Sequence, residues 1–355
     1  MIAQFDVNTI WRRKFGEALR RRFPATLLIA PRAFGVKDSD ESDSSISISL
    51  PPGWAGRTSA LGMSILRWRT EALAARRGGR IDTAIFTSFH YLPLARSLRG
   101  RARIVYYCSD DYRGYAGWGG AASIDREAEL CRLASLSIFV SISLRDRAIA
   151  EYGLDPAACI VAPNASEPRF SERVPKLAAL AGLKGPVFGV VGGFNERIDY
   201  DFLERLTASD EVGSLALIGP VLPGADGTGA IDRLRGNPKV HWFGAQPHDE
   251  IHAWMAGIDI AVIPYARSDF NHFCSPMRLW DHLAIGQPIL ATDACDQVAH
   301  QPGVIVVPQG GDLDHAIRSA KTVAIGGRRP HLESWDDRAA LVAPLIDTPL
   351  IDGGN

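Results

Sequence analysis

The sequence is sparing in cysteine and has no long hydrophobic run. Its 355 residues include five cysteines, an odd number without any Cys-x-x-Cys spacing. This pattern excludes a disulfide framework and a thiolate zinc site, and it predicts reduced, mostly buried thiols. No apolar segment approaches the roughly 20 residues that a membrane-spanning helix needs, and no signal-peptide pattern opens the sequence. We therefore expect a cytoplasmic protein.

The sequence also has almost no net charge, −1 at pH 7, but its charges are unevenly distributed. Residues 1–100 contain 16 Lys and Arg against 8 Asp and Glu, and the remaining residues contain 23 against 32. This asymmetry predicts that the N-terminal half faces something anionic. Nucleic acid is not the expected partner, because no recognition motif accompanies the basic segments.

Two basic segments account for most of this excess. In the first, Trp11, Phe15 and Leu19 recur at helical spacing. These aromatic and aliphatic residues could pack on the domain's own sheet and leave the cations in solvent. Alternatively, the helix could dock on the anionic cytoplasmic leaflet and make the protein a peripheral membrane protein. The cations of the two segments are Arg12, Arg13, Lys14, Arg20, Arg21 and Arg22, and then Arg57, Arg67, Arg69, Arg76, Arg77 and Arg80.

Short apolar runs alternate with helical stretches along the whole sequence, which predicts doubly wound α/β domains. The length suits two of them. The expected helices include Thr9–Arg22, Arg57–Arg77, Ser123–Leu133 and Trp335–Leu345. The expected strands are Ile2–Phe5, Thr26–Ile29, Ile46–Leu50, Thr83–Phe86, Ile104–Tyr107, Ser137–Val140, Val187–Val191, Leu215–Ile218, Val240–Phe243, Asp259–Ile263, Ile289–Ala291 and Val304–Val307.

A segment with the composition of an interdomain linker divides the sequence. We expect an N-terminal domain over residues 1–165, a linker over 166–185 and a C-terminal domain over 186–328. Residues 329–355 are expected to form a C-terminal helix and tail that pack back across both domains.

The segment that begins at Ser275 carries the strongest functional signal. Ser275 suits a helix N-cap, Pro276 suits the first helical position, and Gly286 is placed to end the helix. The N-terminus of such a helix binds a diphosphate well, and Arg278 adds a full charge. Asp281, one turn further along, can accept hydrogen bonds from a ribose diol. The alternative is an ordinary capped helix with a solvated Arg–Asp pair.

This segment resembles the donor-site helix of the GT-B nucleotide-sugar glycosyltransferases of the family 4, or group 1, type. Their pattern is Ser/Thr-Pro-x-Lys-x-x-Glu-x-x-Ala-x-Gly-x-Pro, with Arg278 here for Lys and Asp281 for Glu. Within that group, residues 106–111 and 197–200 resemble segments of bacterial teichuronic-acid and capsule enzymes. The retaining branch has a second acid eight residues before the helix acid, where this sequence has Phe273, so the stereochemical course stays open.

The resemblance implies two Rossmann-like lobes facing a central cleft, with the nucleotide sugar bound by the second lobe. It also implies a hexosyltransferase that adds a sugar to a glycan or lipid-linked acceptor during bacterial polysaccharide and cell-envelope biosynthesis. The sugar, base and linkage are left open. Two other functions remain: epimerisation or hydrolysis of a nucleotide sugar on the same fold, and a non-catalytic binding component of a polysaccharide assembly complex.

A glycine pair follows the first expected strand of the second domain. Gly192 and Gly193 would let backbone N–H groups approach a phosphate, and Arg197 would neutralise its charge. The alternative is a plain strand–helix turn with a surface arginine. With Arg278, the site would have two cations for one diphosphate, so we expect no metal and no cofactor besides the donor substrate. His272, close before the predicted helix, is a further candidate for donor binding.

Adjacent carboxylates end the expected strand Ile104–Tyr107. Asp110 or Asp111 could accept the proton of an acceptor hydroxyl, with Asp111 marginally preferred. Aspartates at a strand end are also common as turn or cap residues. His90, after the strand Thr83–Phe86, is a secondary catalytic candidate that could instead be a satisfied structural histidine.

Overall fold

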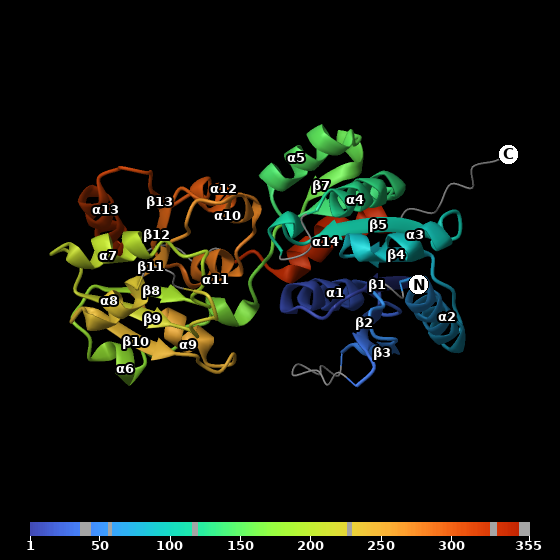
Figure 1. The fold of residues 1–355 in the computed structure, drawn as a ribbon. Helices are drawn as coiled ribbons and strands as arrows, with labels where there is room; N and C mark the ends of the chain where they lie inside the picture. Colours follow the sequence, from blue (N-terminus) through green and yellow to red (C-terminus); the bar gives the residue numbers. More distant parts are fainter. Residues whose placement is uncertain (36–43, 56–58, 116–119, 226–228, 327–331, 348–355) are drawn as a thin grey trace. The chain divides into compact units, whose positions relative to one another are not determined.

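Short strands rich in β-branched residues alternate with helices, and the computed structural model arranges them in two parallel sheets with helices packed against them (Figure 1). The chain divides into two units, Met1–Asn164 with Trp335–Asn355, and Ala165–Ser334. The structure describes residues 1–35, 44–55, 59–115, 120–225, 229–326 and 332–347.

The first unit contains a seven-stranded parallel sheet in the order β3-β2-β1-β4-β5-β6-β7. The order reverses direction between β1 and β4, which makes the carboxyl ends of these two strands the topological switch point. The strands are β1 Ile2–Phe5, β2 Leu27–Ala33, β3 Ile46–Leu50, β4 Thr83–Phe86, β5 Arg103–Cys108, β6 Leu136–Phe139 and β7 Cys159–Val161.

Six α-helices and three short 3-10 turns complete the described part of the first unit. Its α-helices are α1 Ile10–Arg22, α2 Ser59–Arg76, α3 Leu92–Leu98, α4 Ala121–Leu133, α5 Ile142–Tyr152 and α14 Trp335–Ile346, and its 3-10 turns are η1 Phe89–Tyr91, η2 Tyr112–Gly114 and η3 Pro156–Ala158. The C-terminal helix α14 packs against α1, so the end of the chain completes the unit in which it begins.

The second unit contains a six-stranded parallel sheet in the order β10-β9-β8-β11-β12-β13, with its switch point between β8 and β11. Its strands are β8 Val187–Val191, β9 Ser214–Ile218, β10 Val240–Gly244, β11 Ile260–Ile263, β12 Ile289–Thr292 and β13 Val304–Val307. Its helices are η4 Pro168–Ser171, α6 Ala178–Ala181, α7 Tyr200–Ala208, α8 Ala230–Gly236, α9 Ile251–Ala256, α10 Asp269–Phe273, α11 Met277–Ile285, α12 Asp296–Ala299 and α13 Leu313–Gly326.

Each central strand is buried on both faces, as expected for a parallel sheet covered by helices. Every residue of β8, β9, β11 and β12 is buried. Their side chains form the core of the second unit together with Phe202, Leu279 and Trp280 from the helices. The apolar runs that predicted these strands are therefore the residues that hold the unit together.

The predicted strands all exist, and all but one of their ends lie within one residue of the prediction. The exception is β2, which extends to Ala33 instead of ending at Ile29. The three-residue edge strand β7 is absent from the prediction, because its short run is not distinctive. The expected linker, 166–185, contains η4 and α6, and Ser166 pairs with Ser334 within the second unit.

The five cysteines are buried and free of disulfides, as predicted. Within the described ranges, no helix has both the length and the apolar character needed to cross a membrane.

Candidate functional site

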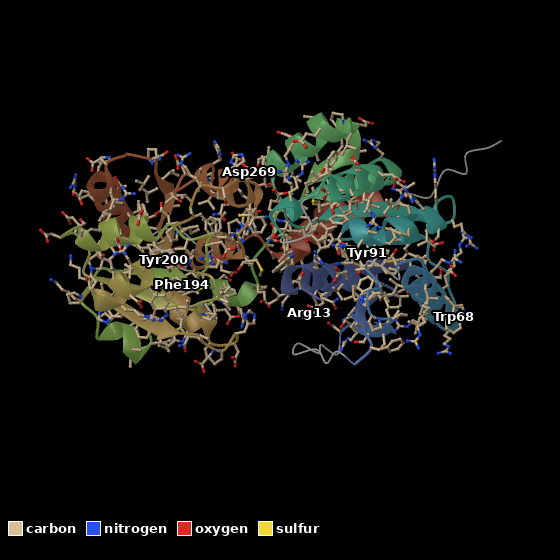
Figure 2. All side chains as sticks on the ribbon, viewed as in Figure 1. Arg13, Trp68, Tyr91, Phe194, Tyr200 and Asp269 are labelled. Carbon is tan, nitrogen blue, oxygen red and sulfur yellow. The ribbon has the colours of Figure 1, made fainter. Side chains whose placement is uncertain are left out.

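The switch point of the second sheet brings together two loops that carry candidate residues. Gly192 directly follows β8, and Tyr265 lies just beyond the carboxyl end of β11. In open α/β sheets, ligands bind at the carboxyl ends of the strands where the strand order reverses. Figure 2 shows Phe194, close to this point, and Tyr200, at the start of α7, on the elements that follow β8.

The guanidinium group of Arg278 packs against the backbone of Gly192. A Cβ atom at residue 192 would lie only 2.3 Å from Nη2 of Arg278, and Gly192 has a φ of +125°. Glycine is thus needed here both for its conformation and for the close approach. Nη1 of Arg278 is buried and meets no hydrogen-bond acceptor among the described residues.

Arg197 approaches the same place from the loop after β8. The guanidinium carbons of Arg197 and Arg278 lie 5.2 and 5.5 Å from the centre of the Tyr265 ring. Nε of Arg197 donates to Oδ1 of Asn271 over 2.7 Å, and Asn271 is itself fully buried. The Asn271 amide donates to the carbonyl oxygens of Arg197 and Ala266. These contacts fix the position of Arg197, so two cations converge on one aromatic ring.

Helix α11 begins one residue later than predicted. Pro276 is the N-cap residue, with extended φ and ψ, and no side chain caps the helix. The prediction of Ser275 as the N-cap is therefore wrong. Instead, the Ser275 hydroxyl accepts a 3.4 Å hydrogen bond from Nε1 of Trp280. Gly286 ends the helix in the left-handed region, as predicted.

Asp281 lies on the second turn of α11 and is buried, with 9% of its surface exposed. Its Oδ1 accepts a 2.6 Å hydrogen bond from the Ser166 hydroxyl. Burial raises the pKa of Asp281 to about 7, and the Ser166 hydrogen bond only partly offsets this rise. The carboxyl group therefore changes its charge near neutral pH instead of forming the solvated pair with Arg278 that was the alternative interpretation.

The remaining donor-site candidates are Gly193 and His272. At Gly193 an added Cβ would make a tight 3.1 Å contact with the flexible end of the Leu222 side chain, which can move away. His272, on α10, is exposed, and its ring lies edge-on to Phe273 with centroids 4.7 Å apart.

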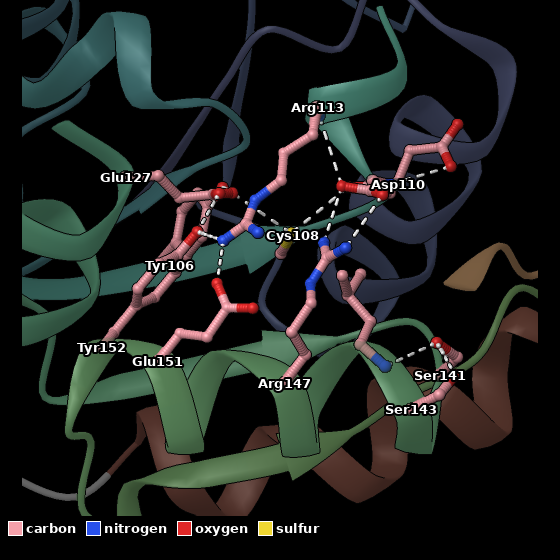
Figure 3. A network of polar contacts seen from close by, with 12 residues as sticks. Tyr106, Cys108, Asp110, Arg113, Glu127, Ser141, Ser143, Arg147, Glu151 and Tyr152 are labelled. Atoms are coloured by element: carbon pink, nitrogen blue, oxygen red, sulfur yellow. Dashed lines mark hydrogen bonds and ion pairs between the residues drawn. The ribbon is translucent and has the colours of Figure 1, made fainter. Parts of the chain in front are cut away.

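The two aspartates after β5 have different surroundings, and Figure 3 labels Asp110 within the network of polar contacts. Asp111 is 2% exposed and forms a bidentate ion pair with Arg147 of α5, at 2.6 and 3.1 Å. Its Oδ1 also accepts from the backbone N–H of Arg113. Asp110 is half-buried and accepts from the Tyr115 hydroxyl at 2.9 Å and from the backbone N–H of Asp111. Asp111 thus holds the loop in place, whereas Asp110 is the more accessible of the two.

A buried network of hydrogen bonds lies next to the loop that follows β5. Glu127 of α4 accepts from the hydroxyls of Tyr106 and Tyr152 at 2.5 and 2.8 Å (Figure 3). The Cys108 thiol lies between Glu127 and the Asp110 carbonyl, and burial raises its pKa. Arg113 pairs with Glu151 and donates to Tyr152.

The switch point of the first sheet holds an ion pair that the sequence did not predict. Arg12 is only 5% exposed and pairs with Asp6 over 2.6 Å. It also donates to the Ser109 and Tyr112 hydroxyls, both at 3.0 Å. Neither interpretation of Arg12, as a solvated cation or as a lipid-facing one, is therefore correct. Phe15 and Leu19 of α1 are buried, which confirms that the helix packs inward.

His90 lies in η1, directly after β4 and near this ion pair. Its pKa is lowered to about 4 because the ring is desolvated and Arg126 opposes a second positive charge. Nδ1 lies 3.4 Å from the Ser88 hydroxyl. At neutral pH the imidazole is therefore uncharged, and it acts as a hydrogen-bonding group instead of a cation.

Several residues of these two sites escaped the sequence analysis. They are Tyr265, Asn271, Ser166, Arg147 and Asp6, together with the buried role of Arg12. Tyr265 could have been found, because it follows a predicted strand end at the switch point. The others act across distances of up to 115 residues in the sequence, as Ser166 does toward Asp281, and no local pattern signals them.

The chain is similar to known proteins in part of its sequence and in its fold. No family model matches the chain. Over 123 residues the chain is 27% identical to TuaH of Bacillus subtilis, a proposed teichuronic acid biosynthesis glycosyltransferase. The match covers 35% of this chain and 30% of TuaH, so it spans less than a third of that relative. It confirms the resemblance to teichuronic-acid enzymes.

Solved structures match nearly the whole chain at low sequence identity. Anabaena HepE in complex with UDP and glucose matches 97% of this chain and 95% of its own, with a TM-score of 0.66 and 16% identity. Sucrose-phosphate synthase from Thermosynechococcus elongatus matches 97% and 94%, with a TM-score of 0.64 and 15% identity. The catalytic domain of starch synthase IV from Arabidopsis thaliana, bound to ADP and acarbose, matches 97% and 98%, with a TM-score of 0.64 and 11% identity. These likenesses confirm the predicted GT-B type of α/β fold.

Proposed function

We propose that this chain is a glycosyltransferase that moves a hexose from a nucleoside-diphosphate sugar to a glycan or lipid-linked acceptor in bacterial envelope polysaccharide synthesis. The observation that carries the proposal is the convergence of Arg197 and Arg278 over Tyr265 beside the backbone of Gly192. TuaH, HepE bound to UDP and starch synthase IV bound to ADP support the same substrate class.

The second unit supplies the donor chemistry. A diphosphate at Gly192 would meet the guanidinium groups of Arg278 and Arg197 and the N-terminus of α11. When the bond between the sugar and the diphosphate breaks, negative charge grows on the leaving nucleotide, and the two cations stabilise it. Because these charges are already in place, we propose that transfer needs no divalent metal. Asp281 would accept hydrogen bonds from the ribose hydroxyls.

The first unit supplies the acceptor chemistry. We propose Asp110 as the group that accepts the proton of the acceptor hydroxyl, since Asp111 is engaged by Arg147. His90, uncharged at neutral pH, would donate or accept a hydrogen bond from the acceptor or the sugar. We further propose that the protein works at the cytoplasmic face of the plasma membrane, where a lipid-linked acceptor would be presented.

A donor-consumption assay tests the proposal. The protein is incubated with UDP-, GDP-, ADP- and dTDP-sugars, with and without a bacterial lipid extract, and the released nucleotide and the lipid-bound sugar are measured. We expect one donor to be consumed in the presence of the extract, with sugar appearing in the lipid fraction and no effect of EDTA. Consumption without acceptor would indicate a hydrolase, and conversion of one nucleotide sugar to another would indicate an epimerase. If no donor is consumed, the non-catalytic alternative is favoured.

A further inference from the structure

Helix α2 carries apolar residues on two opposite faces. Its inner face packs on the first unit through Gly62, Met63, Leu66, Thr70 and Ala74, which are buried. An ordinary surface helix would place polar residues opposite such a face. Here the opposite face is also largely apolar, so burial within the unit does not explain the composition of the helix.

The outer face carries Leu61, Ile65, Trp68 and Ala72 in one line. Their spacing of four, three and four residues places them above one another on a helix. Leu61 is 58% exposed and Trp68 is 66% exposed, while Ile65 and the small Ala72 are half-buried. Among the described residues, Trp68 is the most exposed large hydrophobic side chain. Figure 2 shows Trp68 on α2. We call these four residues the outer stripe.

The charges around the outer stripe are mostly positive. Arg69 and Arg76 are exposed and, at helical spacing, lie along one side of the stripe. From Ser59 to Arg80 the chain contains five arginines against a single acid, Glu71. An apolar line bordered by cations is complementary to a surface that has an apolar interior and anionic groups outside it. Two identical copies of this helix face would repel each other through their positive charges.

Helix α1 does not offer such a surface. Phe15, Ala18 and Leu19 are buried, Ile10 and Trp11 are half-buried, and α14 packs against the helix. Arg12 is held inside the unit, Arg20 donates to the carbonyl of Ser44, and Arg21 pairs with Asp336 of α14. Exposed cations that border an exposed apolar line are therefore found on α2 and not on α1.

We propose that α2 lies in the plane of an anionic bilayer surface, with the outer stripe inserted among the acyl chains and the arginines at the lipid phosphates. A line of tryptophan and aliphatic residues with flanking cations is the composition of interfacial helices. At 1.5 Å per residue, the 18 residues of α2 would contact about 27 Å of membrane. The inference rests on the proposed function, since it names the surface that would present the protein to a lipid-linked acceptor.

Vesicle flotation tests this inference. The full chain is mixed with vesicles of phosphatidylcholine alone or of phosphatidylcholine with about 30% phosphatidylglycerol, at low and high salt. We expect binding to the anionic vesicles that weakens with salt. The double variant L61S/W68S should lose at least about tenfold in partitioning, and R69Q/R76Q should lose the preference for anionic lipid.

Two controls separate insertion from general damage. W68F keeps an aromatic ring and should bind like the wild type. Ile142→Ser on α5 removes a hydrophobic side chain that is also 58% exposed, and it should leave binding unchanged. Nucleotide binding, measured without vesicles, should be equal in all variants, so failure of the docking surface is distinguishable from failure of the donor site.

Three results would overturn the inference. The first is that the wild type does not float with anionic vesicles even at low salt. The second is that L61S/W68S floats as well as the wild type does. The third is that light scattering shows a dimer that L61S/W68S converts to a monomer, which would assign the outer stripe to a second copy of the chain.

Discussion

The guanidinium group of Arg278 occupies the space that a side chain at Gly192 would need. The separation between a Cβ built at Gly192 and Nη2 of Arg278 would be 2.3 Å, well inside contact distance. Gly192, directly after β8, thus leaves the space that the guanidinium group of Arg278 from α11 occupies. Substitution of Gly192 would disturb Arg278 without removing any functional group from the site.

Gly192→Ala should therefore weaken binding of a nucleoside diphosphate by about tenfold or more. The methyl group would displace Arg278, and a φ of +125° strains any residue with a Cβ. Calorimetric titration measures the change. Gly193→Ala is the matched control, because its Cβ would meet only the flexible end of Leu222 and would keep the backbone N–H. Equal losses in the two variants would contradict this account of Gly192.

Asp110→Asn and Asp111→Asn should fail in different ways. Asp111→Asn removes the buried carboxylate that pairs with the half-buried Arg147, and it should lower the free energy of unfolding by about 3 kcal/mol. Asp110→Asn should leave that free energy nearly unchanged and reduce sugar transfer at least about a hundredfold. Urea unfolding and the transfer assay give the two quantities. Full transfer activity in a folded Asp110→Asn variant would remove Asp110 from the mechanism.

Asp281 should make the protein less stable as the pH rises. Its folded pKa of about 7 lies above the ordinary value of 3.8, so the folded state holds its proton more tightly than the unfolded state does. Stability is then lost between about pH 4 and pH 7, by up to about 4 kcal/mol. Asp281→Asn should abolish this loss in urea unfolding measured across that range. An unchanged pH profile in the variant would contradict the assigned pKa direction.

His282 should have the opposite effect, making the protein less stable as the pH falls. It is fully buried, and burial lowers its pKa to about 4, while its Nδ1 contacts Oε1 of Gln287 at 2.6 Å. The folded state resists protonation, so stability falls as the pH drops from about 6.5 toward 4. In wild type this opposes the contribution of Asp281. The Asp281→Asn variant should therefore lose stability in acid more steeply than the wild type does.

The sequence predicted the strands well because each central strand is a short apolar run buried on both faces. Val187–Val191 and Thr83–Phe86 match the structure residue for residue. Prediction was poorer where a tertiary contact overrides a local preference. Ser275 has the side chain of an N-cap, yet Pro276 takes that position and Ser275 accepts from Trp280.

The sequence predicted that Gly192, Arg197 and Arg278 lie near one another, as they do, but it did not predict the residues that hold them in place. Asn271 holds Arg197 across 74 residues, and Arg147 holds Asp111 across 36. Arg12 seemed part of a basic helical face until the fold placed it beside Asp6. Such pairings depend on which loops meet at a sheet edge, and helical or strand periodicity carries no information about them.

The most direct test of the central claim is calorimetric binding of UDP, GDP, ADP and dTDP to the wild type and to Arg278→Ala. The account predicts that one of these nucleotides binds the wild type with a dissociation constant between about 1 μM and 1 mM. It further predicts that Arg278→Ala weakens this binding at least about tenfold, and that the matching nucleoside without phosphates loses far less. Binding of none of the four by the folded wild type, or binding unaffected by Arg278→Ala, would contradict the account.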